Sequence, residues 1–538
     1  MSLKSVPSTK EIRYDRQLRL WGDDGQDRLE RAHVCLLNAS ALGTEVLKSL
    51  VLPGVGAFTI YDGENVHGRD VGNNFFLSHD AIGKPRAQIA CDLLKELNPE
   101  VKGNFVVESP NHLLDNNISA LDSFSVVIGT NLIERTARQI SEYLWPRKIP
   151  FIHARCYGLI GYVRICVEEH TVVDLHPDNP TPDLRMDKPF PALAEIVKMT
   201  DLNAMTYQEH SHTPYLLILL KGLEKWRTKK GDPTALPSSY QERKEFKELL
   251  FSMRKPDDKG AVDEENFKEA ADALVRTMHR TGVPSSVKQL IADAKCTNLT
   301  ADSTDFWLLV SALAEYVDEA DALPLAGVLP DMTSDSARYS KLSSAFHEQA
   351  AADAKRVYDL VQKRLTSLKL PASRISLKDA ANFCKNAANL RLVRGTPLSD
   401  ELAGTASAIQ GELESYDATW SGPSMEAPVP VIAPAVWYVL LRAADRFATE
   451  KSRYPGTNGV PCHLDNHDLT LRVRALFDDW HAPHFVEKIR DEAVDEICRY
   501  GAGEPHPIAA LLGGIVAQET IKLITHQYLP VDNTFVYD

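Results

Sequence analysis

The chain has 538 residues, of which 44% are apolar and 25% are charged, and its net charge is −14 at pH 7. This length is enough for roughly two to four domains, and the composition is ordinary for a globular protein. The acidic balance argues against nucleic acid as a main partner, because neutralising phosphates requires a basic excess. The first residues lack the apolar core of a signal peptide, and apolar runs such as TPYLLILL are too short to cross a bilayer. We therefore expect no membrane contact.

The cysteine pattern predicts neither a metal site nor a disulfide framework. Eight cysteines are scattered along the chain, and none forms a C-x-x-C pair. Reduced thiols are typical of the cytoplasm and nucleus, so we expect the protein in one or both of these compartments.

Residues 33 to 168 alternate between strand and helix patterns. The segments HVCLLNA, AFTIYD, GNFVVES, FSVVIGT and PFIHARC read as short buried strands. Amphipathic helices are predicted between them, over about 42–52, 84–97 and 133–145. Strands separated by helices indicate βαβ units and a parallel sheet. The next stretch, YGLIGYVRICVEE, predicts a glycine-bent strand or hairpin that leaves the sheet.

The pattern changes from residue 171 onward. A proline-rich connection is followed by long helical patterns, for example over 344–368 and, after Pro434, over 435–451. The last fifty residues return to an apolar helix, HPIAALLGGIVAQETIKLI, and a short strand, NTFVYD. We therefore predict an α/β fold with a Rossmann-like domain made of residues 1–170 and 490–538, interrupted by a mainly helical insertion over residues 171–489.

The loop after the first strand has the position of a nucleotide-binding loop but few of its glycines. It reads Asn-Ala-Ser-Ala-Leu-Gly over residues 38–43, where a dinucleotide site has G-x-G-x-x-G. Gly43 suits the third position, and Asn38 tolerates left-handed backbone angles, whereas Ser40 places a side chain where phosphate should approach. Asp62 ends the second strand, as a ribose-binding carboxylate does. Two interpretations remain open: an occupied nucleotide site, or a retained fold with an empty pocket.

Several longer motifs resemble a known family. RYDRQLRLWGDDGQDRLERAHVCLL, IYDGENVHGRDVGNNFF, IGKPRAQIA and PIAALLGGIVAQETIKLIT resemble the ThiF/MoeB-like adenylation fold of the enzymes that activate ubiquitin and ubiquitin-like proteins. LWGDDGQ, DLRMDKPFP, HSHTPY, LPDMTSDSARYSKL and RYGAGEPHPIAA resemble the regulatory subunits (amyloid-precursor-protein-binding type) of heterodimeric neddylation-activating enzymes. This resemblance covers essentially the whole chain.

The resemblance implies that the adenylation chemistry is missing here. Active members bind ATP and magnesium with a glycine loop, an Asn-Arg-Gln triplet, a lysine and an aspartate. Here the triplet aligns with Asn-Asn-Phe at residues 73–75, and the aspartate aligns with Asn131, whose amide lacks the anionic oxygen that holds magnesium. Lys84 and Asp62 do match, although Lys84 reads equally well as a solvated lysine at a helix start. Lys84, Asp62 and Gly43 are then the vestiges of a nucleotide site. We therefore expect that this chain binds no cofactor and that a partner subunit binds ATP and magnesium.

One catalytic contribution is implied for the N-terminus. In the family a Tyr-x-Arg-Gln segment reaches across the dimer and places its arginine near the ATP phosphates of the other half. Here that segment is residues 14–17, which makes Arg16 the candidate, and a guanidinium suits phosphate charge. The alternative is a salt-bridged surface residue among Arg13, Asp15 and Arg19.

The resemblance also implies a partner that carries the thioester chemistry. In the family the nucleophilic cysteine belongs to the catalytic subunit, and the insertion here resembles the cysteine-free counterpart of the catalytic-cysteine domain. Cys296, in DAKCTNL, is the thiol with which this expectation can be tested. The segment over residues 329–342 is either an ordinary surface loop or a contact with the catalytic subunit. The candidate contact residues are Asp331, Met332, Arg338, Tyr339 and Lys341.

We therefore expect a regulatory or scaffold subunit, inactive alone. Together with a catalytic subunit it adenylates a Nedd-type modifier, loads it as a thioester on the partner's cysteine and passes it to a conjugating enzyme. One alternative is the equivalent subunit for a SUMO-type modifier, although the subunits of that type are much shorter chains. The other is a self-sufficient adenylating enzyme or NAD-dependent oxidoreductase, which the altered loop and Asn131 disfavour.

Overall fold

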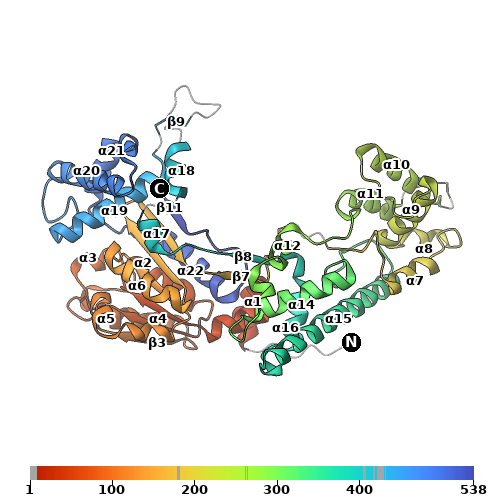
Figure 1. Ribbon diagram of the computed structural model, residues 1–538, viewed down its shortest axis with the longest axis horizontal. Coiled ribbons are helices and arrows are strands. Elements are labelled where there is room, and N and C mark those ends of the chain that lie inside the picture. The colour runs from red at the N-terminus through yellow and green to blue at the C-terminus, as the bar shows by residue number, and fades with distance from the viewer. Residues whose placement is uncertain are drawn as a thin grey trace. The chain divides into compact units, whose positions relative to one another are not determined.

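The computed structural model describes residues 9–178, 182–257, 259–260, 262, 264–403, 407–415, 419–420, 429–430 and 432–538 (Figure 1). The chain forms two compact units. One combines Met1–His170 with Leu392–Asp538, and the other is Thr171–Arg391. We call them the α/β unit and the helical unit.

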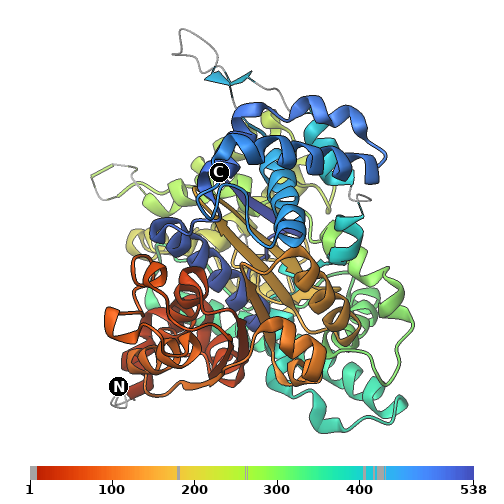
Figure 2. The same cartoon turned by 90° about the vertical axis from the view of Figure 1, so that its left-hand side faces the viewer.

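The α/β unit is built on a seven-stranded sheet with the strand order β11-β6-β5-β4-β1-β2-β3. Strands β1 to β5 run parallel to one another, whereas β6 is antiparallel to both β5 and β11. Helices pack around this sheet (Figure 2). Apolar runs predicted all five parallel strands, and β1, β2, β4 and β5 are buried as expected because helices cover both faces of such a sheet. The expectation of a buried strand was wrong for β3, which lies at the edge of the sheet and is exposed or half-buried throughout. The bounds are β1 His33–Leu37, β2 Ala57–Tyr61, β3 Lys102–Val106, β4 Val126–Thr130, β5 Phe151–Tyr157, β6 Ile160–Cys166 and β11 Thr534–Tyr537.

Helices from both ends of the chain cover this sheet. The predicted helices after β1, β2 and β4 are present, and Pro434 occupies the first turn of α19, as expected. The helices of this unit are α1 Thr9–Arg31, α2 Ala41–Val51, α3 Gly68–Val71, α4 Arg86–Leu97, α5 Pro110–Asn117, α6 Glu134–Leu144, α17 Leu398–Leu402, α18 Ser407–Ser415, α19 Pro434–Lys451, α20 Cys462–Asp479, α21 Asp491–Tyr500 and α22 His506–Thr525.

The chain does not divide at residue 489, where the insertion was expected to end. Residues 392–489 belong to the α/β unit, since α19, α20 and α21 share one hydrophobic core with Tyr157, Ile160 and Tyr162 of the sheet. Arg155 of β5 also forms a buried ion pair with Asp445 of α19. Helical periodicity predicted α19, but it carries no information about the surface against which a helix packs.

The expected hairpin after β5 is present, but it does not leave the sheet. Strand β6 pairs with β5 on one side and with β11 on the other. Gly158 makes the turn with φ 62°, and a β-carbon there would lie 2.1 Å from Cγ of Tyr500. Only glycine fits this combination of backbone angle and close packing.

The helical unit contains one long helix and several shorter ones. Helix α15 is longer than the predicted 344–368, because Asp335 caps it earlier by accepting a hydrogen bond from the Arg338 amide. Helices α14 and α16 pack along it. The helices are α7 Pro191–Met199, α8 Tyr207–Ser211, α9 Tyr215–Lys230, α10 Tyr240–Phe251, α11 Glu265–Thr277, α12 Ser285–Ile291, α13 Ala294–Thr297, α14 Asp305–Ala320, α15 Ser336–Ser367 and α16 Leu377–Lys385. Outside the seven-stranded sheet, β7 His170–Val172 pairs with β8 Arg391–Val393. Strand β9 Thr419–Trp420 pairs with β10 Val429–Pro430 within the α/β unit.

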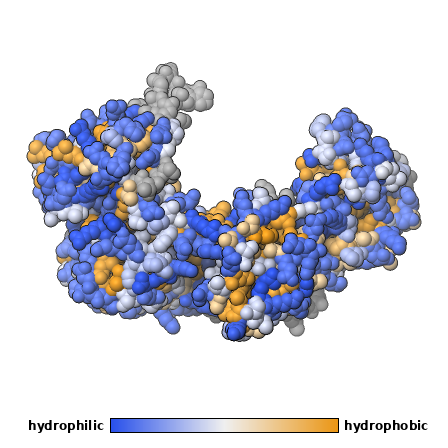
Figure 3. Space-filling model, viewed as in Figure 1, coloured by the Kyte–Doolittle hydropathy of each residue, from blue (hydrophilic) through white to orange (hydrophobic). Residues whose placement is uncertain are grey.

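Within the described residues one helix, α22, is long and apolar enough to cross a membrane by length and composition. The expectation that every apolar run is too short for this was therefore wrong. Helix α22 packs against α1, α2, β5 and β6, and 56% of its apolar window is buried within the fold. Its apolar character therefore reflects its place in the core. On the face shown in Figure 3, hydrophilic residues cover most of the surface.

His153 of β5 is a buried histidine with a clear acid–base consequence. Its Nε2 lies 3.2 Å from the Leu132 carbonyl oxygen, and its Nδ1 lies 3.2 Å from the Tyr162 hydroxyl. Burial, helped by the charge of Arg155, lowers the pKa of His153 to about 3. The imidazole therefore stays neutral in the folded state at pH values where an unfolded chain binds a proton.

We expect the His153→Gln variant to weaken the dependence of stability on acid. The unfolded state takes up a proton near pH 6.5 and the folded state only near 3, so the free energy of unfolding falls as the pH drops through this window. The slope is about 1.4 kcal/mol per pH unit for this group. Urea unfolding at pH 7, 6 and 5 measures it. The exposed His79→Gln variant is the control, and equal slopes for both variants would contradict the prediction.

Candidate functional site

The loop between β1 and α2 keeps the backbone of a phosphate-binding loop without its first two glycines. Asn38 adopts φ 72°, the left-handed conformation that was predicted for it. A β-carbon at Gly43 would lie 2.4 Å from the Asn38 carbonyl oxygen, so Gly43 permits the close approach of helix and strand. The expectation that the turn survives with asparagine in the first position is confirmed.

Ser40 caps α2, and the first amide groups of the helix remain available to an anion. The Gly43 amide donates to Oγ of Ser40 over 3.3 Å. The amides of Ala41 and Leu42 have no partner inside the helix, as is normal for a first turn. Such a helix start binds anions because its N–H groups and its dipole both favour negative charge.

The anion at this helix start is the carboxylate of Glu504, in the loop between α21 and α22. Its Oε1 accepts hydrogen bonds from the Leu42 amide (2.7 Å), from Oγ of Ser40 (2.9 Å) and from Nδ2 of Asn131 (2.9 Å). Its Oε2 accepts from the Ala41 amide over 3.2 Å. A phosphate group therefore cannot reach these donors unless Glu504 leaves. We call Glu504, Ser40, Asn131 and the two amides the carboxylate cradle.

The cradle contains an acid and only neutral donors. Burial raises the pKa of the Glu504 carboxyl, and the hydrogen bonds from Leu42, Ser40, Asn131 and Ala41 act in the opposite direction. Since no cation takes part in these hydrogen bonds, neutral dipoles and the start of α2 stabilise the carboxylate.

Asn131, which the sequence resemblance aligned with a magnesium-binding aspartate, is fixed as a donor to Glu504. It adopts φ 51°, and its Oδ1 accepts a hydrogen bond from the Cys156 amide over 2.9 Å. Its NH₂ group is therefore directed at the carboxylate. An aspartate here would place a second carboxylate against Glu504.

The hydrogen-bonding capacity of the Asp62 carboxylate is taken up by neighbouring groups of the same chain. This fully buried carboxylate accepts hydrogen bonds from the Ala39 amide (2.8 Å) and the Glu64 amide (2.8 Å), and it pairs with Nε of Arg86 at 2.7 Å. These contacts use the carboxylate that the occupied-site interpretation assigned to ribose. Lys84, the other vestige, lies exposed in the turn before α4, which matches the solvated alternative.

Residues 73–75, which align with the family's Asn-Arg-Gln triplet, also have structural roles. Nδ2 of Asn73 donates to the Glu504 carbonyl oxygen over 2.9 Å, so this residue helps to hold the glutamate loop. Asn74 is buried and accepts a hydrogen bond from the Thr44 hydroxyl. Phe75 is 78% exposed and contacts the His506 ring. None of the three supplies a cation for a nucleotide phosphate.

Arg16 lies on an exposed part of α1 that is anchored by the buried Tyr14. The Tyr14 hydroxyl accepts a hydrogen bond from Nδ2 of Asn98 over 2.9 Å, and Tyr14 itself departs from helical backbone angles. Arg13 donates to Asn98, and Arg19 pairs with Asp15. Arg16 therefore extends from a fixed segment, and it does not lie in the carboxylate cradle.

The predicted partner-contact residues divide into two groups. Met332 packs against the core of the helical unit, and Arg338 pairs with Asp335 at the start of α15, so these two contribute to the fold. Asp331 and Lys341 are exposed, and Tyr339 is partly exposed.

The thiols are poorly suited to nucleophilic chemistry. All eight cysteines are free, and each is buried except the half-buried Cys462. Burial raises the pKa of Cys296 above the usual range, which opposes thiolate formation. Within the described ranges, no group of three or more His, Cys, Asp or Glu side chains is arranged to hold a metal ion.

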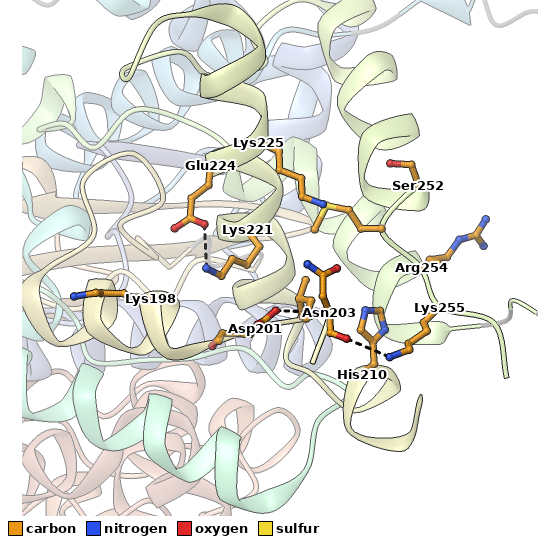
Figure 4. A pocket seen from close by; sticks show the side chains of 13 residues that line it. Lys198, Asp201, Asn203, His210, Lys221, Glu224, Lys225, Ser252, Arg254 and Lys255 are labelled. Atoms are coloured by element: carbon orange, nitrogen blue, oxygen red, sulfur yellow. Dashed lines mark hydrogen bonds and ion pairs between the residues drawn. The ribbon is translucent and has the colours of Figure 1, made fainter. Parts of the chain in front are cut away.

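A separate pocket of about 520 Å³ lies in the helical unit, and its lining is basic (Figure 4). Lys221 pairs with Glu224 at 3.0 Å, and Nζ of Lys255 donates to the Met205 carbonyl oxygen over 2.5 Å. This lining suits an anionic group but has no glycine loop or strand-to-helix turn. The charged residues that line it are Lys198, Lys221, Lys225, Arg254, Lys255, Asp201 and Glu224.

Sequence reasoning did not identify Glu504 as a site residue. Its motif, RYGAGEPHPIAA, contributed only to the family resemblance, and an acidic residue just before a helix is an ordinary feature of helix starts. The two ends of its hydrogen bond to Ser40 are 464 residues apart, so no local spacing could have linked them.

Comparisons with known proteins agree with the fold. The model of the ThiF family matches residues 14–537. The NEDD8-activating enzyme E1 regulatory subunit of Xenopus laevis is 45% identical over 539 residues, which cover 100% of this chain and 98% of that protein. The protein of the same name from Danio rerio is 43% identical, with 99% and 97% covered, and the AXL subunit of Arabidopsis thaliana is 37% identical, with 99% and 97% covered.

With this identity over its full length, the chain belongs to the family of NEDD8-activating enzyme E1 regulatory subunits, within the ThiF family.

Proposed function

We propose that this chain is the half of a heterodimeric NEDD8-activating enzyme that does not bind the nucleotide. ATP and magnesium then belong to the catalytic subunit, together with the cysteine that accepts the modifier before transfer to a conjugating enzyme. The observation that carries the proposal is the Glu504 carboxylate on the amides of Ala41 and Leu42. Arg86 on Asp62 and the amide of Asn131 support it, because neither ribose nor magnesium finds a ligand there.

The proposal predicts where the adenylation activity is found. We expect no modifier-dependent ATP–pyrophosphate exchange from the isolated chain, and exchange once it is combined with its catalytic subunit. The isolated catalytic subunit, assayed at the same concentration, is the control for the contribution of this chain. Exchange by this chain alone would contradict the proposal that the catalytic subunit binds the nucleotide.

We also propose that Arg16 acts on the partner's nucleotide. Its helix is anchored at Tyr14 while Arg16 itself is exposed, which suits a side chain that must reach another chain. Release of pyrophosphate develops negative charge, and a planar guanidinium stabilises such charge with paired hydrogen bonds.

The Arg16→Ala variant tests this role in the assembled enzyme. We expect modifier-dependent exchange to fall about tenfold to a hundredfold, less than the effect of an arginine finger in GTPases, because the active half has cations of its own. Arg19→Ala, an exposed arginine one turn further along the same helix, is the matched control. If both variants lose the same activity, or neither does, Arg16 has no role of its own.

We further propose that the exposed side chains of residues 329–342 contact the catalytic subunit. Exchanging two charges with Asp331→Lys and Lys341→Glu leaves the core contact of Met332 intact. It should raise the dissociation constant of the heterodimer about tenfold, or about 1.4 kcal/mol. Fluorescence anisotropy with a labelled catalytic subunit measures this constant. Lys244→Glu, exposed on α10, is the control, and unchanged affinity in the double variant would contradict the contact.

A further inference from the structure

One internal carboxylate occupies every donor of the carboxylate cradle. We propose that Glu504 acts as a built-in substitute for a phosphate group, and that its carboxylate closes a cradle that would otherwise bind phosphate. The inference extends the proposed function, since it names the residue that makes this half of the enzyme unable to bind a nucleotide.

The donor set itself is one that phosphate uses. Two consecutive amides at the start of an eleven-residue helix converge with a hydroxyl and an amide NH₂ group. This helix follows a parallel strand through a tight turn, which is the arrangement of nucleotide-binding loops. The carboxylate engages these groups with both of its oxygens, as a phosphate would with two of its own.

The loop that carries Glu504 is held in place on both sides. The Gly158 amide donates to the Gly503 carbonyl oxygen over 2.7 Å, and Nδ2 of Asn73 donates to the carbonyl oxygen of Glu504 itself. Nδ1 of His506 lies 3.2 Å from the Asn73 carbonyl oxygen. These contacts keep the carboxylate at a high local concentration, so an external anion must compete with a ligand that is already in position.

Asn131 and Glu504 form a coupled pair in this arrangement. The Asn131 amide is 2.9 Å from Oε1 of Glu504, and its other side is fixed by the Cys156 amide. A magnesium-type aspartate at position 131 would face Glu504 at that distance, and two adjacent carboxylates cannot both ionise without a large cost. The neutral residue at 131 is therefore a condition for the internal carboxylate.

Glu504→Ala, studied in the isolated full-length chain, tests the proposal directly. The probe is inorganic phosphate, titrated by calorimetry. If the carboxylate leaves the cradle in at most about one molecule in ten, it weakens the apparent affinity of an external anion at least about tenfold. We therefore expect phosphate to bind the variant at least about tenfold more tightly than the wild-type chain. Glu492→Ala, exposed in the first turn of α21, is the matched control and should bind like the wild type.

A folded Glu504→Ala variant that binds phosphate no better than the control would overturn the proposal. The proposal would also be overturned if the wild-type chain bound phosphate as tightly as the Glu504→Ala variant. This readout uses one chain and no adenylation assay, so its failure leaves the exchange experiment unaffected, and failure of exchange leaves this result interpretable.

A second experiment does not depend on the alanine variant being folded. We expect Asn131→Asp to lower the melting temperature at pH 7.5 by about 5 °C, through the two facing carboxylates. Adding Glu504→Gln should recover most of this loss, since one of the two charges is then removed. Equal melting temperatures for Asn131→Asp and the wild-type chain, or no recovery in the double variant, would show that the pair is not coupled.

Discussion

The contact of the Glu504 carboxylate with the start of α2 depends on the packing of two helices that are distant in the sequence. Helix α22 lies against α2, and a β-carbon at Gly513 would be 2.7 Å from Cβ of Glu45, so glycine allows the two helices to approach closely. This packing delivers the preceding loop, with Glu504, to the loop after β1. The packing of α22 against α2 therefore both closes the fold and places the Glu504 carboxylate in the cradle.

Buried ion pairs tie the late helices of the α/β unit to its sheet and to α6. Arg155 of β5 pairs with Asp445 of α19, Nε of Arg164 on β6 lies 2.8 Å from Glu401, and Arg442 pairs with Glu134 of α6 at 2.7 Å. Removing one partner of a buried pair leaves an uncompensated charge, which destabilises a fold strongly. Residues 392–489 are therefore held to the sheet by charge as well as by the apolar core that they share with it.

The sequence was informative wherever structure follows from neighbouring residues. Apolar runs marked β1, β2, β4 and β5 because both faces of the sheet are covered there. Asn38 and Gly43 indicated the turn because backbone angles are local properties. The pairing of Glu504 with Ser40 and that of Asp445 with Arg155 join distant positions whose charges look like ordinary surface charges in the sequence. The role proposed for Arg16 depends on atoms of a second chain, which the residues of this one do not describe.

A strand-to-helix loop presents amide groups that need an acceptor, whether or not the protein still binds a nucleotide. Leaving the amides of Ala41 and Leu42 unpaired in a partly buried site would cost about 1–3 kcal/mol each. A subunit with the role proposed here, which leaves ATP to its partner, must remodel this loop, expose it to water or provide an acceptor of its own. Glu504 is such an acceptor, and once it is present Ser40 becomes a favourable donor instead of an obstacle. On this proposal one physical cause, the internal carboxylate, accounts for both a serine at position 40 and a neutral amide at position 131.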